Sequence, residues 1–168
     1  WYASTYSYRK KFVIDRTKVS GTSNLSNFPV LVSLTDADIK TTANGGKAAS
    51  GSGEFVLTSA DGTTVLDHEI ESYTATTGNL VAWVEVPTLS VSSDTVLYLY
   101  YGGPAAGGAT NQNKTGVWDT DYMAVWHLSE GDSTATNFYK DSTLGANHGT
   151  LTDADGDRDS DTVTITVG

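Results

Sequence analysis

Five aspartates alternate with other residues near the end of the chain, at Asp153, Asp155, Asp157, Asp159 and Asp161. Carboxylates crowded into so short a segment repel one another unless a cation neutralises them. Calcium accepts several oxygen ligands in irregular geometry, so the pattern predicts a calcium site. The segment is not an EF-hand, because Gly156 comes too early and Thr164 occupies the place of the closing glutamate. A solvated acidic turn is the alternative.

The segment His68-Glu69-Ile70-Glu71 is the most enzyme-like pattern in the sequence. Glutamates two apart on a regular strand point to one face, with Cα atoms roughly 6.5 to 7 Å apart, which approaches the spacing of glycosidase carboxylates. No aspartate completes the usual acid-base arrangement, and strand faces often carry charge, so cross-strand pairing is the expected role. The sequence offers neither a nucleophile elbow nor zinc-type histidine spacing, and it therefore predicts a non-catalytic protein.

Aromatic residues form a third group that could bind a ligand. Tyr98 and Tyr100 share one face of an expected strand, and Trp118 lies further along the chain. Exposed rings stack on sugars, so these three residues could make the chain a carbohydrate-binding module. Packing in or beside the core is the alternative for each ring.

Two triplets, beginning at Asn24 and Asn113, fit the acceptor pattern for N-glycosylation. Both lie where loops are expected, which is consistent with an exposed product.

The elements that carry these residues are predicted to be β-strands. Period-2 alternation of apolar and polar residues marks eight segments, at 8–15, 29–34, 54–59, 64–73, 80–86, 95–101, 122–128 and 162–167. Turn residues at Asp61-Gly62 and Thr77-Gly78-Asn79 favour antiparallel, meandering pairing. The sequence therefore predicts an all-β fold, an antiparallel β-sandwich or jelly roll with a short β-rich extension at its C-terminal end.

A polar, glycine-rich stretch over 102–116 divides the chain into a sandwich domain, 1–116, and an incomplete β extension, 117–168. The extension holds too few apolar residues for a core of its own, so it packs on the first domain or another chain completes it. Its last strand alternates Val163, Ile165 and Val167 with threonine. Such a strand needs a sheet edge, which a neighbouring copy could provide by strand exchange, or the same chain by folding back.

Composition narrows the class of partner. The 168 residues include 20 acidic and 10 basic side chains, and the net charge of -10 argues against nucleic acid and anionic membranes. No apolar run is long enough to span a bilayer, and the lack of cysteine excludes disulfides and thiolate chemistry. Basic residues gather early in the chain and acidic ones late, so the two ends could attract each other. The start at Trp1 rather than Met suggests either a removed signal peptide or a trimmed chain. The first agrees with the composition, and we expect a secreted or cell-surface protein.

Six short motifs occur once each between Tyr8 and Leu128. They are Tyr8-Arg9-Lys10-Lys11-Phe12, Phe28-Pro29-Val30-Leu31-Val32, Leu66-Asp67-His68-Glu69-Ile70-Glu71-Ser72-Tyr73, Ala82-Trp83-Val84, Tyr100-Tyr101-Gly102 and Gly116-Val117-Trp118-Asp119. With them, this part of the chain resembles a family of microbial secreted domains that is known only as a domain of unknown function. The resemblance implies a β-sandwich module at the N-terminal side of larger extracellular proteins, with no established reaction.

Later motifs resemble other domains. Val125-Trp126-His127-Leu128, Lys140-Asp141-Ser142 and Asn147-His148-Gly149-Thr150 are similar to the opening of a laminin-G or concanavalin-like jelly roll. The last strand resembles the final strand of immunoglobulin-like repeats in bacterial adhesins. Together these features predict a structural or adhesive surface protein that associates with copies of itself into a fibre or surface layer. A carbohydrate-binding module that recognises polysaccharide is the alternative.

Overall fold

The computed structural model describes residues 1–104, 111–131, 133 and 135–152, and the backbone of 162–165. Its strands are β1 (Tyr8–Ile14), β2 (Leu25–Thr35), β3 (Val56–Thr58), β4 (His68–Thr74), β5 (Asn79–Leu89), β6 (Thr95–Tyr101), β7 (Gly149–Thr152) and β8 (Thr162–Ile165). Its short helices are η1 (Arg16–Lys18), η2 (Ala37–Ile39), η3 (Thr42–Asn44), η4 (Ser52–Glu54) and α1 (Lys114–Val117). The chain forms two compact units, Trp1–Asn113 and Lys114–Gly168.

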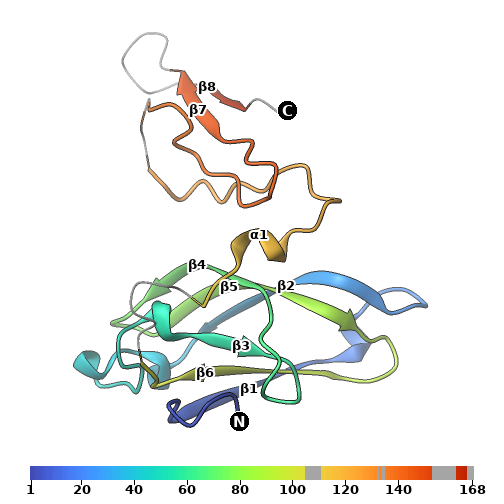
Figure 1. Cartoon of the computed structure of the whole chain (residues 1–168), viewed down its shortest axis with the longest axis vertical. Coiled ribbons are helices and arrows are strands. Elements are labelled where there is room, and N and C mark those ends of the chain that lie inside the picture. Colours follow the sequence, from blue (N-terminus) through green and yellow to red (C-terminus); the bar gives the residue numbers. More distant parts are fainter. Residues whose placement is uncertain (105–110, 132, 134, 153–161, 166–168) are drawn as a thin grey trace. The chain divides into compact units, whose positions relative to one another are not determined.

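The first unit consists of two three-stranded antiparallel sheets, one in the order β1-β6-β3 and the other in the order β2-β5-β4. Figure 1 shows them as two layers. The predicted all-β sandwich is therefore confirmed. In the part of the chain that the structure describes, no helix has the length and apolar character to cross a membrane.

The core lies between the two sheets and follows from the alternation of side chains along each central strand. The fully buried residues of β5 and β6 include Leu80, Ala82, Val84, Val86, Leu97, Leu99 and Tyr101. Residues between them point to the outer faces, because successive side chains of a strand leave on opposite sides. Burying each large apolar side chain contributes about 1.5–3 kcal/mol, so these rows dominate the stability of the unit.

The strand order is not a simple meander. Within the described part of this unit, β4 and β5 are the only neighbouring strands in sequence that pair, through the turn at Gly78. Gly78 has a φ of 70°, and a Cβ there would lie 2.0 Å from the carbonyl oxygen of Asp36, so only glycine fits. The Asp61-Gly62 turn instead closes a short ladder in which Thr58 bridges Val65, after which the chain crosses to the other sheet.

Glu54 anchors the loop that precedes β3, a role that its sequence context did not reveal. The side chain is fully buried, and its carboxylate accepts backbone N–H bonds from Ala49, Ser50 and Gly102, the shortest at 2.7 Å. Its own carbonyl oxygen accepts the hydroxyl of Tyr6. Because Glu54 ends η4, the predicted strand 54–59 is shorter in the structure and begins at Val56.

The second unit contains α1 and a two-stranded sheet of β7 and β8. Its described loops are held by Asp141, whose carboxylate accepts the backbone N–H groups of Val125, Thr143 and Asn147 and the hydroxyl of Thr143. The predicted strand over 122–128 is absent as such, and a single bridge between Trp126 and Asp141 stands in its place. The carboxylate of Asp141 thus takes a backbone donor that a strand would use for its ladder.

Candidate functional site

The two glutamates of the enzyme-like segment lie on either side of a shift in the strand register. Glu69 lies opposite Trp83, but the register shifts between Ile70 and Ser72, so Glu71 is the extra residue of a β-bulge. The equivalence of the two carboxylates on one regular strand face is thereby lost. Glu71 instead accepts a hydrogen bond of 2.8 Å from the indole N–H of Trp83, while Glu69 is buried. The sequence pattern is explained by packing and hydrogen bonding on the second sheet.

His68 is a core residue. Its side chain is fully buried, and its Nδ1 lies 2.9 Å from the carbonyl oxygen of Leu66, to which it donates as a neutral ring. Burial lowers the pKa of His68, since a charged imidazolium would lose its hydration in the core. Nε2 is buried without a hydrogen-bond partner. The imidazole therefore packs as a neutral ring in the folded state.

Tyr98 and Tyr100 share a strand face, with ring centroids 6.4 Å apart. The ring of Trp1 meets Tyr100 edge-on, and Tyr100 is 0% exposed. The Tyr100 hydroxyl donates to the carbonyl oxygen of Gly62 and accepts a bond from the guanidinium of Arg9. Tyr100 therefore has no ring face available for stacking on a sugar.

The third aromatic candidate is also buried. Trp118 is 4% exposed and packs edge-on against Tyr122 at 5.3 Å between ring centroids. Tyr98 is the one ring of the three that stays partly exposed, beneath the guanidinium of Arg9 at 4.3 Å. Of the three predicted carbohydrate-binding residues, Tyr100 and Trp118 thus have rings that packing covers.

The predicted calcium ligands, 153–161, lie outside the described residues. Within the described ranges, no three histidine, aspartate or glutamate side chains gather to form a metal site. The glycosylation candidates Asn24 and Asn113 are both exposed, and the side-chain oxygen of Asn24 accepts the backbone N–H of Val91. Calcium binding and glycosylation stay predictions.

The terminal strand has a partner within its own chain. β8 pairs antiparallel with β7 over four residues, from Gly149 opposite Ile165 to Thr152 opposite Thr162. The sequence did not predict β7. The sheet contains these two strands alone among the described residues, so the second edge of β8 adjoins no described strand. Val167, the last of the three predicted exchange residues, lies outside the described part.

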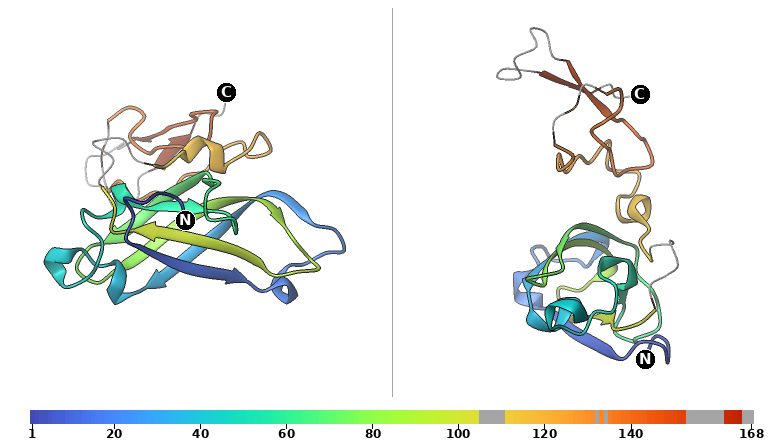
Figure 2. Two further views of the ribbon diagram at one scale, coloured as in Figure 1. Left: turned by 60° about the horizontal axis from the view of Figure 1, so that its bottom comes forward. Right: turned by 90° about the vertical axis from the view of Figure 1, so that its left-hand side faces the viewer.

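One side of the sandwich is open. β1 and β2 are edge strands of different sheets in the described part of the unit and run in opposite directions (Figure 2). Side chains from both strands line one crevice. That crevice has a volume of about 240 Å³, and its lining consists of Phe12, Val13, Ile14, Val30, Leu31, Val32, Ser33, Leu34 and Leu97. Several of these side chains belong to the core yet are only half-buried. The described chain thus leaves apolar core surface accessible between two unpaired sheet edges.

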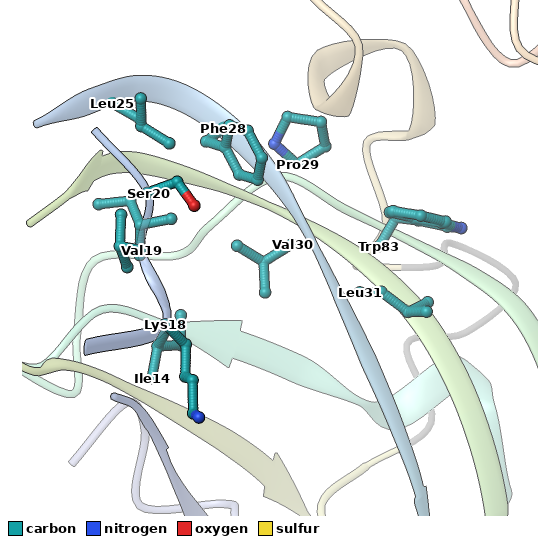
Figure 3. Close-up of a pocket in the computed structure, with 11 residues that line it drawn as sticks. Ile14, Lys18, Val19, Ser20, Leu25, Phe28, Pro29, Val30, Leu31 and Trp83 are labelled. Atoms are coloured by element: carbon teal, nitrogen blue, oxygen red, sulfur yellow. The ribbon is translucent and has the colours of Figure 1, made fainter. Parts of the chain in front are cut away.

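A second apolar hollow, of about 570 Å³, shares Ile14, Val30 and Leu31 with this crevice. Figure 3 shows the residues that line it. Its lining includes Phe28, Leu31 and Trp83 from the second sheet, together with Val19 and Lys18 from the segment after β1. Phe28 is 41% exposed and Leu31 is 49% exposed, so β2 presents two large apolar side chains to this hollow. We call the crevice and the hollow together the β1–β2 groove.

The free backbone groups of β2 can be assigned from its ladder with β5. The backbone N–H of Glu85 donates to the carbonyl oxygen of Asp67, on the β4 side. The backbone N–H and C=O of Glu85 therefore point away from Pro29, its partner on β2. Alternation then directs the backbone groups of Pro29, Leu31 and Ser33 to the free edge. Proline lacks an N–H, and Asn27 interrupts the ladder with a φ of 49°, so the free donors begin at Leu31.

Basic side chains surround one end of the groove, where β2 ends and β1 begins. Lys10 forms an ion pair with Asp36, and this contact holds the pKa of the Asp36 carboxyl below its usual value. Lys47 pairs with Asp38 at 2.8 Å. Lys40 follows η2 in the same segment, so cations outnumber carboxylates at this end.

The sequence contained a signal for this groove. The segment Phe28-Pro29-Val30-Leu31-Val32 is apolar without interruption, whereas a strand with one face in water alternates. The segment entered the prediction as a motif and as part of the expected strand 29–34, but not as a groove, because periodicity does not show on which side a strand lacks a neighbour.

Fold and groove together define the class: an all-β sandwich domain with one open side. The family model for a domain of unknown function (DUF2341) matches residues 53–143, more than half of the chain, and the protein belongs to this family. The match extends over parts of both compact units. The resemblance to a domain of unknown function is confirmed at this level. No curated protein and no solved structure matches the chain.

Proposed function

We propose that the chain is a non-catalytic structural or adhesive module of a microbial cell surface that associates with copies of itself by β-strand addition. The observation that carries the proposal is the β1–β2 groove, in which two unpaired strand edges border exposed apolar surface. An unpaired edge offers a row of N–H and C=O groups to which another strand can hydrogen-bond. Covering the apolar side chains beside that edge removes them from water and stabilises the complex. A secreted location is part of the proposal and is supported by the glycine-, serine- and threonine-rich acidic composition.

The proposed occupant of the groove is a second copy of this chain, because the sequence carries opposite charges in its two halves. Five basic residues and one acidic residue lie in the segment from Arg9 to Lys18. Five aspartates and one arginine lie over 153–161. Two copies can therefore bring unlike charges together while the groove is covered.

The finer resemblances belong to the same proposal. A laminin-G or concanavalin-like opening after Val125 and an adhesin-like last strand both suit a surface protein assembled from β-modules. Calcium bound by the aspartates of 153–161 would reduce the repulsion within that segment and stiffen it.

Self-association is tested by sedimentation equilibrium over a range of protein concentrations. Leu31→Lys places a charge in the groove and should weaken association about tenfold or more, since the ammonium group would have to be buried. Thr74→Lys is the matched control, because Thr74 is exposed on β4 at the opposite edge of the same sheet. A wild-type chain that stays monomeric at millimolar concentration, or equal losses in the two variants, would contradict the proposal.

Polysaccharide binding is the second candidate. It is supported by Trp1 and Tyr98, both partly exposed, with the guanidinium of Arg9 lying 5.1 Å from the Trp1 ring and 4.3 Å from the Tyr98 ring. Rigid aromatic faces of this kind stack on sugar rings. Binding on a glycan array that Tyr98→Ala removes and Leu31→Lys retains would favour this candidate over self-association.

A further inference from the structure

We infer that the terminal strand of one copy, β8, is the segment that occupies the β1–β2 groove of another copy and that it runs antiparallel to β2. This inference rests on the proposed function and names the donor, the acceptor edge and the direction of pairing. The acceptor is the second half of β2, 30–35, which follows Pro29 and the ladder interruption at Asn27 and contains neither.

The acceptor edge has the backbone and side-chain pattern that an added strand needs. Leu31 and Ser33 direct their N–H and C=O groups to the free edge, where no described strand pairs with them. Val30, Val32 and Leu34 alternate with them and point into the crevice, half-buried. A strand that supplies one apolar face and one polar face would complete both patterns.

The sequence of the terminal segment supplies those two faces. From Thr162 to Val167 the residues alternate strictly between threonine and a β-branched apolar residue. The four residues of β8, Thr162–Ile165, extend about 13 Å, equal to the four residues of β2 from Val32 to Thr35. Over Thr162–Ile165 the backbone is already extended, so ordering the donor costs less than ordering a loop.

The stabilisation that β8 loses when it separates from β7 is small. The β7–β8 ladder holds four residue pairs in a two-stranded sheet. Two-stranded sheets are marginally stable in water, whereas the acceptor is the edge of a three-stranded sheet that covers a core. The exchange therefore replaces a weak ladder by one with apolar burial.

Charge favours one direction. If the donor runs antiparallel to β2, its acidic N-terminal side, 153–161, comes beside the end of β2 where Lys10, Lys40 and Lys47 outnumber Asp36 and Asp38 by one charge. The other end of the groove carries Arg16 and Lys18, but Asp15 and Asp94 lie beside them, and each accepts a backbone N–H from η1. Antiparallel pairs are also slightly more stable than parallel ones. Both considerations select the same direction.

The apolar faces then set the register. Placing Ile165 opposite Val32 puts Val163 opposite Leu34 and Thr164 opposite Ser33. Directly opposed residues in antiparallel strands have Cα atoms about 4.5 to 5.5 Å apart, a separation that a disulfide can bridge. The chain has no cysteine, so an introduced pair reports this contact without background.

The test mixes two full-length single variants, Ser33→Cys and Thr164→Cys, under mild oxidation and measures the disulfide-linked heterodimer by mass spectrometry. The heterodimer should form at least about tenfold faster than in a control mixture of Thr74→Cys with Thr164→Cys, because Thr74 lies on the opposite edge. Equal rates in the two mixtures would overturn the inference. A double variant, Ser33→Cys with Thr164→Cys, that closes a disulfide within one chain at high dilution would also overturn it.

The same samples separate this inference from the proposed function. If Leu31→Lys abolishes association while the Ser33 and Thr164 variants fail to cross-link above the control, the chain self-associates through another donor and the inference is wrong. If the wild-type chain stays monomeric at every concentration, the proposed function is wrong and the inference falls with it.

Discussion

Replacing Glu54 by glutamine tests whether one buried carboxylate holds the sandwich together at its loop end. Oε1 accepts the N–H groups of Gly102 and Ala49, and Oε2 accepts those of Ser50 and Ala49. Glutamine keeps one oxygen and turns an NH₂ toward the donors of the other. At least one backbone N–H then loses its acceptor inside the protein.

The cost follows from these contacts. A hydrogen bond to a charged group contributes about 1.5–3 kcal/mol, and a buried donor left unsatisfied costs about 1–3 kcal/mol. We expect Glu54→Gln to lower the free energy of unfolding by about 3 kcal/mol and the melting temperature of the first unit by roughly 10 °C. Urea titration gives the first value, and calorimetry gives the second. Amide hydrogen exchange should accelerate most at Ala49, Ser50 and Gly102.

The matched control is Asp94→Asn, which removes the same charge from the same unit. Asp94 is exposed and accepts one backbone N–H, from Arg16, through an oxygen that asparagine retains. Its loss should stay below about 0.5 kcal/mol. If both variants lose the same stability, or if exchange at Gly102 is unchanged in Glu54→Gln, the anchoring role is refuted.

Three further predictions concern protons and calcium. His68 has a lowered pKa in the folded state, so below its ordinary value of 6.5 the unfolded chain binds a proton that the folded chain does not. Stability should therefore fall as pH decreases below 6.5, by up to about 1.4 kcal/mol per pH unit, and His68→Leu should flatten this slope in urea titrations; an unchanged slope would contradict it. For Asp141, burial alone would raise the pKa, but its hydrogen bonds outweigh burial and lower it, so its stabilising contribution is present above pH 4 and lost as pH falls below about 4. Asp141→Asn should accelerate amide exchange at Val125 and Asn147 and leave the first unit unchanged; protection that persists at Asn147 would refute this. Calcium should bind with a dissociation constant of about 0.1–1 mM by titration calorimetry, and a variant with Asp155→Asn and Asp157→Asn should bind at least tenfold more weakly; equal binding would exclude these ligands.

The strands were predictable wherever one face is buried and the other meets water. The predicted segment 95–101 coincides with β6, and 8–15 and 80–86 lie close to β1 and β5, because alternation reports a half-buried strand directly. The predicted 64–73 begins too early, since the chain first closes the Asp61 turn and only then crosses to the other sheet as β4. The order of strands in each sheet was not predictable, because alternation shows which face of a strand is buried but not which strand pairs with it.

The candidate sites were less predictable, for different physical reasons. Two glutamates two apart imply one face only if the ladder is regular, and the bulge at Glu71 breaks that regularity. Tyr100 and Tyr98 were placed on one face correctly, but nothing local shows that residues about a hundred positions earlier cover that face. The groove depends on the absence of a strand beside β2, a property of the whole topology.

Pro29 and the ladder interruption at Asn27, both at the start of β2, have a consequence for how assembly stops. Pro29 offers no N–H at the free edge, and Asn27 disrupts the ladder two residues before it, so an incoming strand cannot extend its pairing toward Leu25. Templated growth of the amyloid type needs a long, flat edge that accepts any apolar segment in any register. A free edge that is shortened at one end can pair only with a strand of limited length and in few registers. This favours ordered contacts between copies over indiscriminate aggregation.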